Sequence, residues 1–286
     1  MPEPTIDAEQ FRERQRALWD SVALGWQRWW PKFEDGAAAV SERMVELCGA
    51  APGQRVLDVA TGIGEPALRL ARRVGPTGRV LAIDLAPQML LLARQRAQAA
   101  GLDNIEFREM DMERPELERA SFQAATWRWG PMLMRDPVAA LVQLRLALAR
   151  DARLATAVWG SGKDVPFIAI PGDIAERVAG IEKPPPGTPG PLCMGRVGEL
   201  EAALTSAGFR GIEVEEHEVV LRFESSAEYV QFVQDISATL RRMLEEGSAE
   251  VRERTWSAIG REAERWAVSG GGLVFVNRVR VASARA

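Results

Sequence analysis

The residues best suited to chemistry stand directly after three short apolar segments. They are Gly62 and Gly64 after residues 56–59, Asp84 after residues 80–83, and Asp111 and Met112 after residues 105–110. Glycines let the backbone approach a ligand closely, and a carboxylate can accept hydrogen bonds from both hydroxyls of a ribose. An acid beside an apolar side chain suits an adenine, which offers an exocyclic amine and a flat face. The pattern predicts a site for an adenosine-containing ligand.

Charge distinguishes two such ligands. Two glycines followed by an alanine, with an acid twenty residues after Gly64, also fit a dinucleotide-binding fingerprint. Glu65, however, lies at the start of the following helix, where it would repel a pyrophosphate. S-adenosylmethionine (SAM) has no phosphate and carries a cationic sulfonium and an ammonium group. Asp58, just before the loop, can support that ammonium directly or through water, so the charges favour SAM.

These residues must be positioned by parallel strands whose carboxyl ends meet at one edge of a sheet. Strands are predicted at 56–59, 80–83, 105–110, 122–127, 154–159, 212–223 and 273–281. Helices are predicted at 7–30, ended by Pro31, and at 36–49, 66–74, 87–101, 137–149, 168–179, 197–208, 225–243 and 249–267. The predicted fold is α/β: a Rossmann-like, seven-stranded, mostly parallel sheet with a C-terminal antiparallel strand pair and helical lid additions.

The same segments predict the domain organisation. Residues 1–50 form an N-terminal helical cap, 51–160 the SAM-binding core and 161–195 a cap insertion. Residues 196–286 complete the core and carry a helical insertion at 226–267. The insertions leave strand ends at the ligand edge, so we expect them and the N-terminal helices to cover one cavity.

Four segments resemble the class I SAM-dependent methyltransferases, particularly the ubiquinone/menaquinone-biosynthesis methyltransferase branch and related bacterial small-molecule methyltransferases. They are VLDVATGIGEPAL (56–68), VLAIDLAPQMLLLAR (80–94), EFREMDME (106–113) and WRWGPMLMRDPVAAL (127–141). The resemblance covers about residues 40–160. It implies methyl transfer from SAM, with S-adenosylhomocysteine as the product.

The resemblance also implies roles for individual residues. The cofactor-binding set is Asp58, Ala60, Thr61, Gly62, Gly64, Asp84, Leu85, Met89, Asp111, Met112, Trp127 and Arg128. Within it, the glycines approach the methionyl part, Asp84 binds the ribose, and Asp111 with Met112 holds the adenine. Residues after the fourth strand would face the methyl group.

Aromatic residues suggest the chemistry of the acceptor. The substrate-binding set is Trp26, Trp30, Trp129, Met132 and Met134, and the other tryptophans are interpreted as core. Aromatic walls suit an apolar or aromatic acceptor and can stabilise a sulfonium. The predicted function is O- or C-methylation of a small, largely apolar or aromatic metabolite, of the kind found in secondary metabolism.

General bases are scarce, and the catalytic residue is left unknown. His217 is a weak candidate, because it lies mid-strand between two glutamates and also reads as a surface histidine on an edge strand. Tyr229 is interpreted as core, and Asp136 as a helix N-cap before Pro137. Three other functions stay open: methylation of a small amine or thiol, SAM binding by a regulator without turnover, and oxidoreduction with NAD, which Glu65 disfavours.

Composition narrows the partners. The 286 residues carry 36 basic and 40 acidic side chains, a net charge of -4, which gives no electrostatic footprint for nucleic acid. Cys48 and Cys193 lie far apart, and no metal-ligand spacing is present, so we expect no metal. No apolar run suits membrane insertion, and the acidic N-terminus lacks a signal-peptide core, so a cytoplasmic location is predicted. The partner is a small-molecule substrate, and a homodimer stays open.

Overall fold

The computed structural model describes residues 7–185 and 187–286. Residues 1–6 of the predicted N-terminal cap and residue 186 of the predicted cap insertion lie outside this description. Within the described residues, no helix is both long and apolar enough to cross a bilayer.

The fold centres on a seven-stranded sheet in the order β3-β2-β1-β4-β5-β7-β6. The strands are β1 (Arg55–Val59), β2 (Arg79–Asp84), β3 (Ile105–Glu109), β4 (Phe122–Arg128), β5 (Leu148–Trp159), β6 (Arg210–Phe223) and β7 (Leu273–Arg285). Strands β1 to β5 pair in parallel, whereas β7 pairs antiparallel with both β5 and β6. The predicted fold class, with its C-terminal antiparallel pair, is confirmed.

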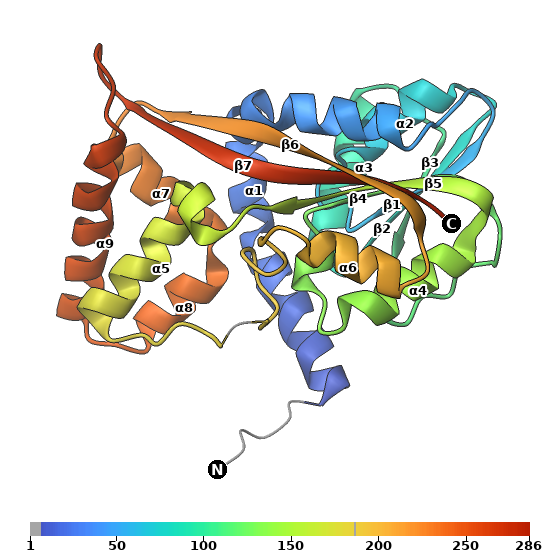
Figure 1. Ribbon diagram of the computed structural model, residues 1–286. Coiled ribbons are helices and arrows are strands. Elements are labelled where there is room, and N and C mark those ends of the chain that lie inside the picture. Colours follow the sequence, from blue (N-terminus) through green and yellow to red (C-terminus); the bar gives the residue numbers. More distant parts are fainter. Residues whose placement is uncertain (1–6, 186) are drawn as a thin grey trace.

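Helices cover both faces of the sheet (Figure 1). Helices α2 (Ala67–Val74) and α3 (Pro87–Ala99) pack on β1, β2 and β3 from one side. Helices α4 (Pro137–Ala147) and α6 (Glu199–Ser206) pack together on the opposite face, against β5, β6 and β7. The central strand β1 is therefore buried from Val56 onward, as its continuous apolar sequence requires.

The N-terminal segment forms one continuous helix, α1 (Ala8–Leu47), which passes through Pro31. The predicted break at Pro31 is wrong. A proline inside a helix costs about 3 kcal/mol, whereas each large apolar side chain that is buried contributes about 1.5–3 kcal/mol. Trp29 and Phe33 flank Pro31 and are both buried. Their combined burial outweighs the penalty, so the chain stays helical through Pro31.

Two glycines let α1 lie directly on the rest of the chain. A Cβ atom at Gly25 would stand 2.1 Å from the carbonyl oxygen of Asp235, and one at Gly36 would stand 2.4 Å from that of Val220. These two contacts lie on either side of Pro31. They fix α1 against the sheet and the C-terminal helices.

Four further helices gather beyond the strand ends, at the left of Figure 1. They are α5 (Pro166–Ala179), α7 (Ser226–Ile236), α8 (Ala238–Glu245) and α9 (Ala249–Ala263). The single helix predicted over 225–243 is wrong, because Ser237 leaves the helical conformation with φ -101° and ψ 76°. Helices α5 and α7 pack on α9, and α1 packs on α7 and α8, so the additions form one layer beside the sheet.

Candidate active site

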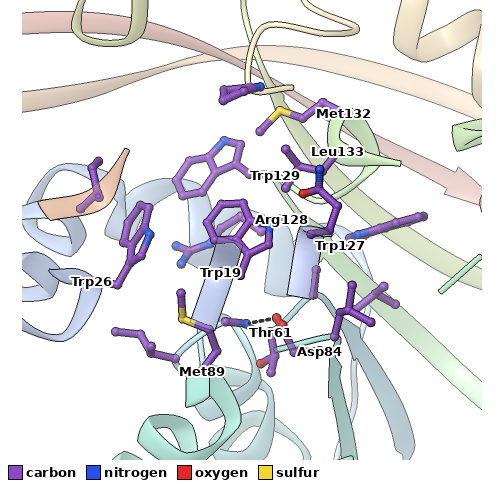
Figure 2. Close-up of a pocket in the computed structure, with 18 of the residues that line it drawn as sticks. Trp19, Trp26, Thr61, Asp84, Met89, Trp127, Arg128, Trp129, Met132 and Leu133 are labelled. Carbon is purple, nitrogen blue, oxygen red and sulfur yellow. Dashed lines mark hydrogen bonds between the residues drawn. The ribbon is translucent and has the colours of Figure 1, made fainter. Parts of the chain in front are cut away.

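A cavity of about 290 Å³ opens at the carboxyl ends of β1, β2, β4 and β5 (Figure 2). Its walls also include side chains of α1, α5 and α7. Ligands of open α/β sheets bind outside the carboxyl ends of the strands, and this cavity has that position.

The loop after β1 is fixed to the end of β2. The backbone N–H of Thr61 donates to the carbonyl oxygen of Ile83 at 2.9 Å, and that of Gly62 donates to Asp84 Oδ2 at 2.8 Å. Asp84 Oδ1 accepts from the backbone N–H of Ala86 at 2.9 Å. Desolvation raises the pKa of the Asp84 carboxyl to about 6, although these backbone donors oppose the shift. The carboxylate is therefore held in a fixed orientation at the cavity wall.

Asp58 lies behind this wall and is fully buried. Its Oδ1 accepts a hydrogen bond of 2.5 Å from the Thr126 hydroxyl. Its Oδ2 is buried without a hydrogen bond among the described residues, although the nearby Thr61 hydroxyl lowers the pKa of the carboxyl. Burial raises the pKa of the Asp58 carboxyl to about 7. Structural carboxylates are rarely left half-satisfied, so this group is a candidate for supporting a cationic ligand.

The opposite end of the cavity is aromatic. Trp129 stacks on Trp159 with ring centroids 4.5 Å apart, and Phe33 contacts both rings edge-on. Trp26 adds a further edge-to-face contact with Phe33. Trp129 has φ of 57°, a conformation that strains a bulky residue and that clusters at functional sites. The backbone thus turns this indole into the cavity at the expense of local strain.

A network of buried and half-buried charges lies along the same wall. Glu34 of α1 pairs with Arg69 at 3.0 Å and with Arg128 at 3.1 Å. Glu65 pairs with Arg69 and Arg96, each at 3.3 Å. Glu65 therefore faces two cations, and the charge repulsion that the sequence suggested for this position is largely neutralised.

Most of the predicted ligand residues line this one cavity. They are Ala60, Thr61, Gly62, Asp84, Leu85, Met89, Asp111, Met112, Trp127 and Arg128 of the cofactor set, and Trp26, Trp30, Trp129, Met132 and Met134 of the substrate set. Two predicted residues, Asp58 and Gly64, lie outside the lining. A Cβ atom at Gly64 would stand 2.4 Å from Leu68 Cδ1, so this glycine serves helix packing behind the loop.

The weak candidate base His217 lies away from the cavity. It stands on the edge strand β6, where its Nε2 is 3.0 Å from Glu215 Oε2. Tyr229 is buried, and its hydroxyl donates to the carbonyl oxygen of Phe167 at 2.8 Å. The Asp136 side chain accepts from the backbone N–H of Ala139 at 2.9 Å, as expected of an N-cap. None of these three residues is in a position to take a proton from a ligand in the cavity.

Sequence reasoning missed part of the wall. Trp19 and Trp159, interpreted as core, line the cavity, and so do side chains without a motif of their own: Phe11, Gln15, Phe167, Ile168, Pro171, Phe232, Val233 and Ile236. The helical period of the tryptophans on α1 was the available signal for Trp19. The residues of α5 and α7 gave no such signal, because an apolar helix face has the same sequence pattern whether it packs against a core or against a ligand.

Comparisons with known proteins agree with this geometry. Residues 56–151 match the family model described as a methyltransferase domain. The chain is 36% identical over 137 residues to 2-phytyl-1,4-naphtoquinone methyltransferase of Trichormus variabilis, across 48% of this chain and 56% of that protein. It is 32% identical over 136 residues to the ubiquinone/menaquinone biosynthesis C-methyltransferase UbiE of Pseudomonas putida, across 47% and 49% of the two chains. The chain thus spans about half the length of these curated relatives.

Among solved structures, phosphoethanolamine N-methyltransferase 2 of Haemonchus contortus, in complex with S-adenosylhomocysteine, superposes with a TM-score of 0.58. The match covers 98% of this chain and 60% of that one at 16% identity, which shows a shared fold. Fold, strand-end motifs and sequence relatives agree: residues 56–151 match a methyltransferase domain.

Proposed function

We propose that the protein transfers the methyl group of SAM to a small, largely apolar or aromatic metabolite, at oxygen or carbon, by in-line displacement. The observation that carries this proposal is the continuity of the cavity. One cavity connects Asp84 at the end of β2 with the stacked indoles of Trp129 and Trp159. A cofactor held by the first would present its reactive end toward the second.

The residues at the strand ends fit SAM. The oxygens of Asp84 bind two backbone N–H groups and retain lone pairs that can accept the ribose hydroxyls. Asp111 and Met112 line the same cavity beyond Asp84 and would hold the adenine. The Oδ2 atom of Asp58, which has no hydrogen bond within the described chain, would stabilise the cationic ammonium of SAM electrostatically across the loop or through a bridging water.

SAM would supply a methyl group already activated by its sulfonium. The chain's own contribution is alignment and exclusion of water, and alignment alone can lower a barrier by about 7–11 kcal/mol. Helices α1, α5 and α7 enclose the aromatic end with apolar side chains. The strained backbone of Trp129 fixes one wall of that end.

The acceptor end favours a flat, apolar molecule. Its proposed contacts are Trp26, Trp30, Trp129, Met132 and Met134, and methionines adapt their shape to irregular ligands. Two relatives are named 2-phytyl-1,4-naphtoquinone methyltransferase and ubiquinone/menaquinone biosynthesis C-methyltransferase, and these names refer to ring systems of this kind. These observations support the class of acceptor. The assay below identifies the atom that is methylated.

The helical additions define the acceptor in this proposal. Residues 7–50, 161–185, 187–195 and 226–267 act as one cap over the core at 51–160, which residues 196–225 and 268–286 complete. Cytoplasmic location and a homodimer stay predictions, and cell fractionation and light scattering test them.

The decisive assay follows isotopically labelled methyl from SAM into a panel of phenols, quinones, thiols and amines, with products identified by mass spectrometry. We expect labelled products from phenols, or from quinones supplied in their reduced quinol form, with equal yield in the presence of a chelator. Labelled amines or thiols alone would replace the proposed acceptor class. Tight SAM binding without transfer to any member would point to a regulator, and absence of SAM binding would refute the proposal.

A further inference from the structure

The cavity contains hydrogen-bond donors that nothing in the described chain accepts. The buried indole nitrogens of Trp26, Trp127 and Trp129 have no partner among the described residues. That of Trp127 faces the backbone, because a Cβ atom at Gly130 would stand 1.9 Å from it. Trp26 and Trp129 belong to the aromatic end. A buried N–H without an acceptor is unfavourable, so these two donors indicate a ligand oxygen.

Arg128 lies among these indoles (Figure 2). Its guanidinium stands 4.6 Å from the ring centroid of Trp129 and 5.3 Å from that of Trp30. One terminal nitrogen contacts Glu34 and the Ser41 hydroxyl. Those are its only hydrogen bonds within residues 7–185 and 187–286, although a guanidinium carries five N–H donors. The residue is 7% exposed, so its remaining donors are kept from bulk water beside the cavity.

The charges of this wall leave room for an anion. The ion-paired members of the network are the cations Arg69, Arg96 and Arg128 and the carboxylates Glu34 and Glu65, three positive against two negative. The buried carboxyl of Asp58 also interacts with Arg128, but its raised pKa of about 7 keeps it protonated below that pH. Glu42 also contacts Arg69, but its side chain is 63% exposed and its charge is screened by water. An anion beside Arg128 would balance the buried part of the network.

The lining also lacks a free base. Among its described residues there is no histidine, tyrosine, lysine or cysteine. Each lining carboxylate is engaged: Asp84 and Asp111 accept backbone N–H groups, Glu113 accepts from the backbone of Asp136, and Glu65 pairs with arginines. An acceptor that is already ionised when it binds would not need a protein base.

We propose that Arg128, with the indole N–H groups of Trp26 and Trp129, binds the acceptor as an oxyanion, so that the substrate is an acidic hydroxyl of an aromatic ring. This inference rests on the proposed methyl transfer. The phenol loses its proton to water as it binds. The oxygen, or a ring carbon activated by it, then forms the bond to the methyl carbon while the carbon–sulfur bond breaks. After attack by carbon, the ring proton also leaves to solvent.

The test measures ionisation of a bound probe and needs no turnover. The probes are 4-nitrophenol and 4-nitro-1-naphthol, whose anions absorb differently from the neutral forms. Each is titrated with pH in the presence of S-adenosylhomocysteine and the protein, whose cofactor binding is measured in the same samples by calorimetry. We expect the bound probe's pKa to fall by about one unit, which is a tenfold preference for the anion.

Variants assign the effect. Arg128→Gln should abolish the shift, and Arg128→Lys should keep part of it, because a charge remains without the fork of donors. Trp26→Phe and Trp129→Phe should each reduce it by removing one N–H group. Trp266→Phe is the matched control, because Trp266 stacks on Phe275 and is absent from the cavity lining. It should leave the shift unchanged.

Three results would overturn the inference. A protein that binds S-adenosylhomocysteine but takes up neither probe, or takes up only the neutral phenol, lacks an oxyanion site. An unchanged pKa of the bound probe in the Arg128→Gln variant would show that the guanidinium does not bind the oxyanion. The third result concerns the cofactor. If Arg128→Gln weakens the binding of S-adenosylhomocysteine but not of methylthioadenosine, which lacks the carboxylate, and the probe still binds as before, then Arg128 binds the cofactor instead. If the native protein binds no S-adenosylhomocysteine, the proposed function itself is refuted, whatever the probes do.

Discussion

Replacing Asp58 by asparagine should stabilise the protein and weaken its hold on SAM at the same time. Burial raises the pKa of this carboxyl from 3.8 to about 7. The folded state therefore favours the protonated form, and the stability that this gives is lost as the pH rises from about 4 through about 7. A difference of about three pKa units corresponds to roughly 4 kcal/mol of destabilisation at pH 8.

Asparagine avoids that penalty because it stays neutral. Its carbonyl oxygen can keep the hydrogen bond from Thr126, but its amide would replace an oxygen that has no partner in the described chain. An unpaired buried amide costs about 1–3 kcal/mol, which leaves a net gain of about 1–3 kcal/mol at pH 8. For a protein of this size, that corresponds to a rise of roughly 2–12 °C in melting temperature.

Thermal unfolding of both proteins at pH 8 and pH 5 checks the stability, and calorimetry checks SAM binding. At pH 5 the native carboxyl is protonated, so the advantage of asparagine should vanish. Loss of a charge-assisted interaction should weaken SAM roughly tenfold to a hundredfold at pH 8. Asp103→Asn, at an exposed position, is the control. Asp58→Asn melting below the native protein at pH 8 would refute the reasoning, because the buried charge would then be compensated.

Three further predictions concern the loop, the charge network and the ribose site. Gly64→Ala should lower the free energy of unfolding by about 1–3 kcal/mol in urea, because its Cβ meets Leu68 and its φ is 108°; Gly62→Ala, whose Cβ meets nothing within 4 Å, should cost less. Glu34→Gln should cost about 3 kcal/mol in urea unfolding by leaving the buried Arg128 without a carboxylate, whereas Glu106→Gln, in an exposed pair with Arg108, should cost under about 1 kcal/mol. SAM affinity of the Asp58→Asn variant, in which residue 58 no longer titrates, should fall by up to about tenfold per pH unit below about pH 6 in calorimetry, because the ionised Asp84 accepts the ribose hydroxyls and its pKa in the free protein is about 6.

Each of these predictions has a contradicting result. Equal effects of the two glycine substitutions would mean that Leu68 yields to the added methyl group. Equal effects of Glu34→Gln and Glu106→Gln would show that the buried network behaves like a surface pair. A flat affinity profile across pH 5–7 would remove Asp84 from ribose binding.

The fold could be predicted because its signals are local. The apolar run ending at Val59, the glycine loop and the acid at Asp84 recur with the spacing of a βα unit, and parallel strands place all their carboxyl ends together. The antiparallel edge was expected because the last two strands lack a short crossover connection. Helix limits depend on tertiary packing as well as on local sequence. The break predicted at Pro31 is wrong because the packing of Trp29 and Phe33 outweighs the local penalty of a proline in a helix.

The site could be predicted at the cofactor end and only partly at the acceptor end. Strand-end residues such as Asp84 and Trp129 carry their position in the sequence pattern. The contacts of Glu34 with Arg69 and Arg128 cross from α1 to α2 and β4, and no local pattern encodes them. For the same reason Glu65 suggested an isolated charge, whereas the structure gives it two arginines.

The unbroken helix α1 also has a consequence for the order of folding. Trp29 donates a hydrogen bond of 2.7 Å to Asp235, and Arg43 pairs at 2.6 Å with Glu215, across sequence separations of 206 and 172 residues. A ribosome makes α1 before any strand of the sheet and long before either partner. Its apolar face must then wait, exposed or loosely covered, until β6 and α7 have emerged. Docking of this first-made helix is therefore complete only after α7 has emerged, and the cavity, which α7 also lines, is complete no earlier.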